Sequence, residues 1–330
     1  MFDPLICEVT RGTMVESRHR VHAMVCDASG PVKTWGDPDL MFYPRSAIKF
    51  MQSLPLVESG AADARRVNVA ELALASASHS GTPTHVDAVA AWLKRIGLGA
   101  DHLGCGAHLP YDITSAHALI RADQSPTRLN NNCSGKHTGF LTTALHLGEP
   151  TQGYLDPEHP IQRRLYEILV TLGGQNLADT GRGLDGCGIP VYGMTLTALA
   201  QAARKMADPS GLGEERGKAV KRILSAVMAE PFMVGGPDRF DTDIMGALGG
   251  KAATKGGAEG VHIAILPEKG LGIALKAEDG EKRAADVAMG HLLVEAGVIG
   301  QEESRKLAKH LQPTVYNAAG DAVGAIRMAG

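Results

Sequence analysis

A serine and a lysine near the N-terminus have the spacing of a catalytic pair. Ser46 and Lys49 are separated by two residues, and Pro44 precedes them at the start of an apolar helical pattern. Proline is favoured in the first turn of a helix, so we expect Ser46 at a helix N-terminus. Residues three apart share a helix face, and a lysine partly desolvated by Phe50 and Met51 can act as the base for the serine. The pair predicts nucleophilic catalysis, although most Ser-x-x-Lys sequences are solvated helix surface.

A second group of hydroxyls follows a strongly apolar helical pattern. Residues 75–82 contain Ser78 and His79 and are closed by Gly81, which suits a tight turn. These side chains could face an active site. The alternative is a serine-rich helix C-terminus in which His79 is structural, because serine and glycine are ordinary turn residues.

A lysine stands in a glycine-rich segment late in the chain. Lys255 precedes two glycines in residues 254–261, which run into a predicted strand. Glycines at such a place allow another backbone or a ligand to approach closely. Lys255 could therefore reach an active site, and Lys251 is the competing candidate.

Two polar, glycine-containing segments carry soft metal ligands. Residues 129–139 contain Cys133 and His137, and we expect a turn that presents these groups just before a helix over residues 140–147. With Asp185 and Cys187 they would form a plausible zinc site if the two segments meet. The spacing matches no zinc-finger pattern, and buried inert thiols are the alternative.

Composition indicates a compact enzyme-sized globule. The chain has 330 residues, of which 44% are hydrophobic, enough for a buried core. The net charge is -3 and no basic stripe occurs, so nucleic acid is not expected as a partner. The N-terminus lacks a secretory signal and no run reaches about 18 apolar residues, which predicts a cytoplasmic protein without a membrane segment. Five cysteines, an odd number, do not suggest a disulfide framework.

The predicted elements divide the chain into strand-rich ends and a helical middle. Short apolar runs at residues 5–9, 21–26, 260–266 and 272–276 predict strands, and residues 283–296 predict a helix. Residues 46–233 are dominated by helical patterns. The terminal strands can form one sheet only if they come together. We predict a sheet domain from residues 1–45 and 255–330, a mainly helical domain from residues 46–254, and one catalytic unit.

Five segments in this order resemble the rhizobial-type, or class 3, L-asparaginases over nearly the whole chain. They are residues 44–49, 78–81, 132–137, 185–188 and 255–260. The resemblance implies an α+β fold related to serine β-lactamases and glutaminases, with an antiparallel sheet covered by terminal helices and an all-helical subdomain. A homodimer is also implied. The chain lacks a Ser-Asp-Asn element and Lys255 is followed by glycine, which argues against β-lactam hydrolysis.

The resemblance also implies roles for individual residues. It pairs Ser46 with Lys49 and Ser78 with Lys255 around one substrate cavity. It implies a zinc ion that orients the substrate and is not itself required for the chemistry. Its ligands would be Cys133, Lys136, Cys187 and water, with Asp185 steadying them. Lys136 thus replaces His137 in the ligand set, and a lysine ligand must be neutral, so zinc binding should weaken as pH falls.

The expected reaction is the hydrolysis of L-asparagine. Lys49 would remove the proton of Ser46, which attacks the side-chain amide, forms an acyl-enzyme and releases ammonia. Arg45 and His137 are secondary candidates for binding the substrate or supporting the zinc site. One alternative is a glutaminase or esterase-type acyltransferase with the same pair. Another is a non-catalytic, zinc-dependent binding protein.

Overall fold

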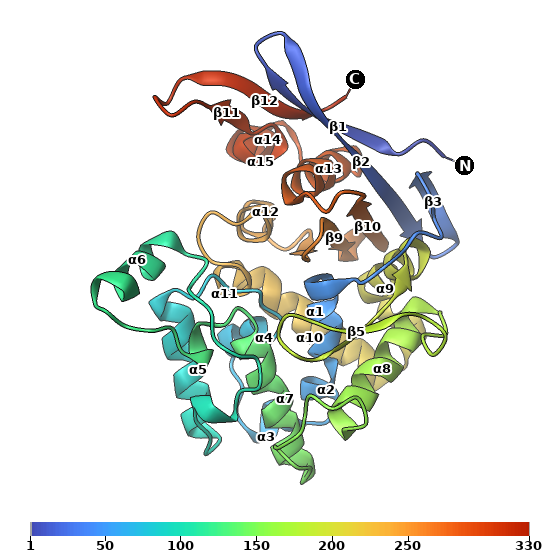
Figure 1. The fold of residues 1–330 in the computed structure, drawn as a ribbon. Coiled ribbons are helices and arrows are strands. Elements are labelled where there is room, and N and C mark those ends of the chain that lie inside the picture. The colour runs from blue at the N-terminus through green and yellow to red at the C-terminus, as the bar shows by residue number, and fades with distance from the viewer. Residues whose placement is uncertain (1, 330) are drawn as a thin grey trace.

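Strands from both ends of the chain pair in one antiparallel sheet of the computed structural model, which describes residues 2–329 (Figure 1). β1 (Leu5–Arg11) lies between β2 (Met14–Asp27) and β12 (Ala322–Met328). The other strands of this sheet are β3 (Gly30–Trp35), β8 (Ala253–Gly256), β9 (Val261–Leu266), β10 (Leu271–Ala277) and β11 (Thr314–Tyr316). The order is β11-β12-β1-β2-β10-β9-β8, and β3 also pairs with β2. The first and last strands are therefore neighbours, as the sequence predicts.

β9 is buried along its whole length because a helix covers each face of the sheet there. α13 (Lys282–Glu295) packs on one face and α9 (Leu196–Ala207) packs on the other. Successive side chains of a strand point to opposite faces. Ile263 and Ile265 accordingly join the core that contains α9, while the alternate side chains join the core that contains α13. A strand buried on both faces needs a nearly continuous apolar run, which explains the sequence of this segment.

The helical part packs around α7 (Ser134–Leu147), whose side chains are buried from Ser134 to Ala144. Gly135 leaves room for the backbone of Leu74, so α7 and α4 (Val69–Ala75) pack closely. The other helices are α1 (Lys49–Gln52), α2 (Leu54–Glu58), α3 (Ala61–Ala64), α5 (Pro83–Arg95), α6 (Ile113–Arg121), α8 (Pro160–Gly173), α10 (Glu214–Ala229), α11 (Pro231–Val234), α12 (Phe240–Leu248), α14 (Gln301–Lys306) and α15 (Ala308–Leu311).

The predicted α+β class is confirmed, because an antiparallel sheet covered by helices lies beside a mainly helical part (Figure 1). The expectation of an almost all-helical middle is wrong for residues 182–195, where glycines disfavour a continuous helix and the chain forms short strands instead. These are β5 (Arg182–Leu184), β6 (Pro190–Tyr192) and β7 (Met194–Thr195), and β7 pairs with β4 (Met41–Phe42). β8 spans the predicted domain boundary between residues 254 and 255, and α9, from the predicted helical domain, covers the sheet.

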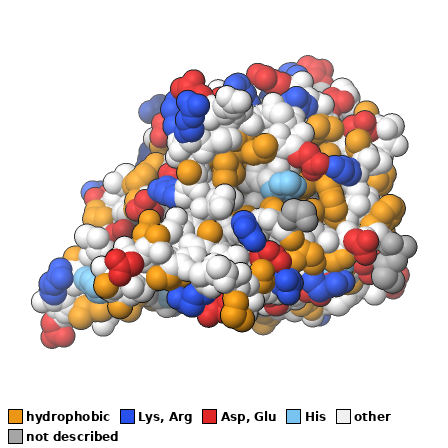
Figure 2. All heavy atoms as spheres, turned by 90° about the horizontal axis from the view of Figure 1, so that it is seen from above, with side chains coloured by type: hydrophobic (Ala, Val, Ile, Leu, Met, Phe, Trp, Pro, Cys, Tyr) orange, Lys and Arg blue, Asp and Glu red, His pale blue; other side chains and the backbone are white. Residues whose placement is uncertain are grey.

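The described residues contain no helix that could span a membrane, and the face seen in Figure 2 carries charges of both signs. Of the helices within residues 2–329, none combines the length and the apolar character needed to cross a membrane. On the face seen from above the sheet, the Lys and Arg side chains that are described alternate with Asp and Glu (Figure 2). This mixture gives that face no extended positive field.

Candidate active site

Ser46 lies in a tight turn whose backbone is strained at the preceding residue. Arg45 has a φ of 50°, in the left-handed region where side chains other than glycine are uncommon. The turn is a short 3₁₀ helix over Arg45–Ile48 that follows Pro44 and continues into α1. Gly257 approaches so closely that a Cβ there would lie 2.9 Å from the carbonyl oxygen of Pro44. Gly257, which directly follows β8, therefore packs tightly against the turn that carries Ser46.

Lys49 is buried at the start of α1 and uses all three of its N–H donors. Its Nζ donates to the carbonyl oxygen of Ala77 at 2.6 Å, to Ser78 Oγ at 2.9 Å and to Cys133 Sγ at 3.1 Å. The bond to Ser78 reaches the serine that the resemblance pairs with Lys255. Lys49 therefore links the two implied Ser-Lys pairs.

Ser78 lies in the irregular segment that follows α4, beside a buried histidine. His79 Nδ1 accepts a hydrogen bond from the N–H of Gly81 at 3.1 Å, so the proton is on Nε2, which donates to Ser134 Oγ at 2.8 Å. Burial holds the pKa of His79 well below its usual value. The ring is neutral and cross-links two segments, which favours the structural interpretation of His79.

Lys255 in β8 is fully buried, whereas Lys251 is exposed. Burial lowers the pKa of Lys255 to about 7, and the positive charge of Lys49 adds to this effect against the opposing carboxylate of Asp241. Its Nζ donates to the carbonyl oxygen of Gly256 at 2.7 Å. The side chain of Lys251 is 49% exposed and lies 3.8 Å from a surface glutamate. Of the two candidates, Lys255 is the one that faces the interior.

A cavity of about 430 Å³ brings the two serines together. Lys49 lies behind its wall, bonded to Ser78, and Lys255 directly precedes Gly256, which lines it. The lining comprises Ser46, Ser78, Tyr111, Asn132, Arg239, Phe240, Asp241, Gly256, Gly257, Ala258, His262 and Lys282. Hydroxyl nucleophiles and buried amines next to one small cavity are the components of covalent serine catalysis.

Cys133, Lys136 and Cys187 form a group of possible metal ligands next to Lys49. Lys136 Nζ donates to Cys187 Sγ at 3.0 Å. A hydrogen bond from Cys133 lowers the pKa of Cys187 to about 5 against the effect of burial, and the same bond raises that of Cys133 to about 12. Two sulfurs and an amine thus converge. Burial opposes it, but the charges of Cys187, Cys133 and Asp185 raise the pKa of Lys136, so its amine would have to lose a proton before it could bind zinc. No group of three or more His, Cys, Asp or Glu side chains within residues 2–329 could hold a metal ion, so any metal here would need the lysine.

Asp185 contacts both the group of possible metal ligands and the turn that carries Ser46. Its Oδ2 lies 3.4 Å from Cys187 Sγ and its Oδ1 accepts from Arg45 Nε at 2.6 Å. Burial raises the pKa of Asp185, but the charges of Lys136 and Arg45 outweigh it and lower the value to about 2. The Arg45–Asp185 pair therefore connects the strained turn to the soft donors.

His137 lies within α7, so the expectation of a turn there is wrong beyond residue 133. The small residues around it suit a helix buried on all sides, which starts at Ser134. Its Nδ1 bonds to the hydroxyl of Tyr154 at 2.7 Å, and burial lowers its pKa to about 3. Among the described residues its buried Nε2 has no hydrogen-bond partner.

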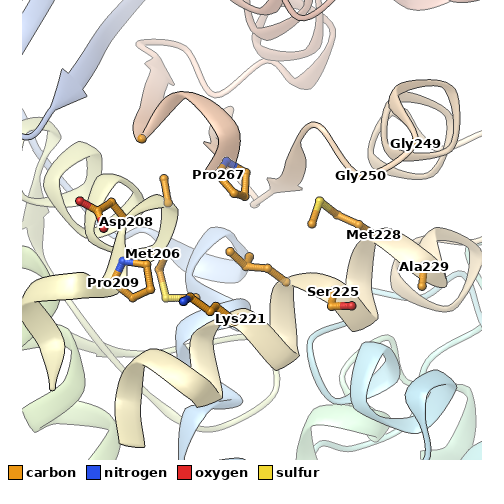
Figure 3. A pocket seen from close by; sticks show the side chains of 13 residues that line it. Met206, Asp208, Pro209, Lys221, Ser225, Met228, Ala229, Gly249, Gly250 and Pro267 are labelled. Carbon is orange, nitrogen blue, oxygen red and sulfur yellow. The ribbon is translucent and has the colours of Figure 1, made fainter. Parts of the chain in front are cut away.

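A larger groove of about 660 Å³ lies away from the serines, between α9, α10 and turns of the sheet part (Figure 3). Met206, Pro209 and Met228 give it an apolar lining, to which Lys221 and Asp208 add charged side chains (Figure 3). It contains none of the serine, lysine and cysteine candidates. The smaller cavity is therefore the candidate active site.

Asp241 and His262 are among several cavity residues that the sequence patterns did not single out. Asp241 is in the first turn of α12 and His262 is in β9, and both line the cavity with the serines. His262 interrupts an otherwise apolar run over Val261–Leu266, a signal that could have singled it out. Asp241 is one of several acidic residues near the start of a helix, where they are common.

Solved structures of low sequence identity resemble most of the chain. A β-lactamase from Mycobacterium bovis is 16% identical, with 84% of this chain and 94% of that chain covered and a TM-score of 0.42. A β-lactamase from Sphaerobacter thermophilus is 14% identical, with 86% and 93% covered and a TM-score of 0.41. The glutaminase Mglu is 14% identical, with 86% and 66% covered and a TM-score of 0.48. No curated protein matches the chain. The family model described as L-asparaginase II matches residues 7–328, and the chain belongs to that family.

Proposed function

We propose that this member of an amide-hydrolysing family converts L-asparagine to L-aspartate and ammonia through an acyl-enzyme on Ser46. The observation that carries the mechanism is the buried Lys49 amine, 2.9 Å from Ser78 Oγ in the wall of a cavity that Ser46 shares. A buried amine beside a hydroxyl nucleophile is one of the recurring means of activating serine. The strained turn at Arg45 supports Ser46 as the attacking residue.

The proposed reaction has two steps. Lys49, which donates three hydrogen bonds at rest, first gives up one proton to become a neutral amine. Ser46 Oγ then attacks the side-chain amide carbon and its proton passes to Lys49, with Ser78 able to relay it. The carbon–nitrogen bond breaks, and the leaving nitrogen takes a proton and departs as ammonia. Water then attacks the ester and gives a proton to the enzyme, which releases aspartate and restores Ser46. Lys255, with a pKa of about 7, is suited to both giving and accepting protons near neutral pH.

The negatively charged oxygen of each intermediate needs nearby donors. The N–H of Ser46, in the strained turn, is the candidate that the local backbone offers. In β8 and just after it, the N–H groups of Gly256 and Gly257 already donate, to Asp241 and to the carbonyl oxygen of Val261. They are therefore not available for this purpose without rearrangement.

Zinc is part of the proposal as a supporting ion. Cys133, Lys136 and Cys187 would hold it, and Asp185 would steady Cys187. When bound, the ion would supply a positive charge that orients the substrate. Metal content measured by atomic emission tests this role independently of activity. Stoichiometric zinc in the wild type and its loss in Cys187→Ala are expected, and a Cys187→Ala protein that keeps full zinc contradicts it.

The decisive experiment measures ammonia release from L-asparagine and L-glutamine by wild type, Ser46→Ala and Ser78→Ala, with circular dichroism to check folding. Activity on asparagine that falls by roughly 10⁴-fold or more in a folded Ser46→Ala protein supports the nucleophile. Preference for glutamine would favour a glutaminase, and ammonia from neither amide refutes the proposal. Homodimer formation stays a prediction of the resemblance, which light scattering tests. A cytoplasmic location stays a prediction from the sequence, which cell fractionation tests.

A further inference from the structure

The sheet side of the cavity carries a buried carboxylate that the reaction above leaves unassigned. Asp241 accepts hydrogen bonds from the N–H of Gly256 at 3.2 Å and 3.0 Å, one at each oxygen. Its Oδ2 lies 3.7 Å from Lys255 Nζ and its Oδ1 lies 3.3 Å from His262 Nε2. The Asp241 side chain is 11% exposed, and those of Lys255 and His262 are 1% exposed. Three ionisable groups are thus packed together at the wall of the serine cavity.

We propose that Asp241 is a positioning residue for the hydrolysis. Its carboxylate holds the Lys255 amine at the cavity wall, and the contact with His262 weakens the attraction between this carboxylate and the amine. The inference rests on the proposed function for its catalytic meaning. Asp241 acts through Lys255, because its own oxygens are already occupied by the backbone of Gly256 and by two basic side chains.

The charged groups around Lys255 explain why the Asp241 carboxylate has a large effect on the pKa of this lysine. Besides Asp241 on α12, the groups that act on this amine are Lys49 from α1, Arg239 from the segment before α12, and Cys133 at the start of α7. Burial and the two cations lower the pKa of Lys255, while Asp241 is the foremost group that raises it. A single charge at this distance in a buried site shifts a pKa by roughly 1 to 3 units. Without Asp241, the amine would lose its proton well below neutral pH and lose its anchor.

His262 approaches the other oxygen of the same carboxylate. Its Nδ1 faces the carbonyl oxygen of Ile263 at 3.1 Å, and Nε2 faces Asp241 and, at 4.0 Å, Asp286. Although burial opposes it, His262 and Lys255 together hold the pKa of Asp241 far below its usual value. Removing His262 would leave Lys255 as the one basic side chain among the described residues that lies within 4 Å of this carboxylate. Removal of Asp241 and removal of His262 should therefore shift the titration midpoint of Lys255 in opposite directions.

The test follows Lys255 directly by NMR, using full-length protein with ¹³C-labelled lysine side chains. The Lys255 signal is assigned by its absence in Lys255→Met. In Asp241→Asn, which keeps an acceptor for Gly256, the titration midpoint is expected to fall by roughly one pH unit or more. Asp243→Asn is the matched control on the same helix, because Asp243 pairs with Lys309 and His310 away from the cavity. An unchanged midpoint in folded Asp241→Asn overturns the proposal.

His262→Asn provides an independent test if Asp241→Asn does not fold. Its Lys255 midpoint is expected to rise, and a fall or no change refutes the role given to His262. The pH profile of kcat on asparagine should move in the same direction as the midpoint in each variant, with a smaller change in KM. A midpoint that shifts while wild type releases no ammonia from asparagine leaves the charge coupling intact and refutes the proposed function instead.

Discussion

The two buried lysines of the candidate site differ in how their surroundings hold them. Lys49, on the helical side, donates to three acceptors within 3.1 Å, of which two are side chains from other elements. Lys255, on the sheet side, donates to the carbonyl oxygen of the next residue and faces a carboxylate at 3.7 Å. Both side chains are almost completely buried. The residue type is the same, but only one amine is fixed by several segments of the chain.

This difference suggests a division of labour. A fully hydrogen-bonded group has its geometry fixed by its partners, so Lys49 is suited to taking the Ser46 proton at a fixed position. A buried amine with few partners pays the cost of desolvation and releases its proton more readily, so Lys255 is suited to moving protons near neutral pH. Each of the following changes tests one side of this comparison.

Lys49→Met should have the largest effect. It removes the amine that contacts Ser78 and leaves Ser46 without its proposed base, and a base of this kind contributes typically 10² to 10⁴-fold to rate. We expect kcat on asparagine to fall by roughly 10³-fold or more, measured as ammonia release. If a folded Lys49→Met enzyme keeps a tenth of wild-type kcat, Lys49 is not the base and the roles of the two lysines must be exchanged.

Gly257→Ala should have the next largest effect, because it moves the serine turn without touching a reacting group. A Cβ at this position would lie 2.9 Å from the carbonyl oxygen of Pro44 and 3.2 Å from the nitrogen of Ala47. A displacement of about 1 Å in a catalytic group can cost roughly 10²-fold in rate. We expect kcat to fall by about that factor while circular dichroism stays native.

Gly246→Ala is the matched control for this substitution. Nothing lies within 4 Å of a Cβ at Gly246, which is in α12. Alanine should stabilise this helix by roughly 0.5 to 1 kcal/mol and leave kcat unchanged. Equal losses of activity in both variants would show that the close approach at Gly257 has no special part in placing Ser46.

The sequence predicts the framework of this molecule better than its charge network. The family match confirms the resemblance seen in the ordered segments, and the largely apolar run of β9 predicts a buried strand. The hydrogen bond from Lys49 to Ser78 could not be predicted, because it joins α1 to a segment after α4 through tertiary packing. Asp241 likewise meets Lys255 only when α12 packs on β8. No local sequence pattern predicts contacts of this kind between segments that are far apart in the chain.

Titration of Lys255 should also appear in protein stability, where it can be separated from catalysis. The pKa of Lys255 falls from the ordinary lysine value of 10.5 in the unfolded chain to about 7 in the folded protein. Between these two pH values the unfolded chain binds one more proton than the folded protein, so this group makes stability rise with pH. Above 10.5 and below 7 its contribution is constant.

Comparison with Lys255→Met isolates this effect, because all other titrating groups are shared by the two proteins. One proton corresponds to about 1.4 kcal/mol per pH unit. Between pH 7.5 and 9.5 the free energy of unfolding of wild type should therefore rise more steeply than that of Lys255→Met, by up to about this slope, in urea titrations. Parallel curves would mean that Lys255 keeps its proton in the folded protein. In that case Lys255 could not serve as the proton carrier. The two lysines would then differ in their hydrogen-bond partners but not in how readily they release a proton.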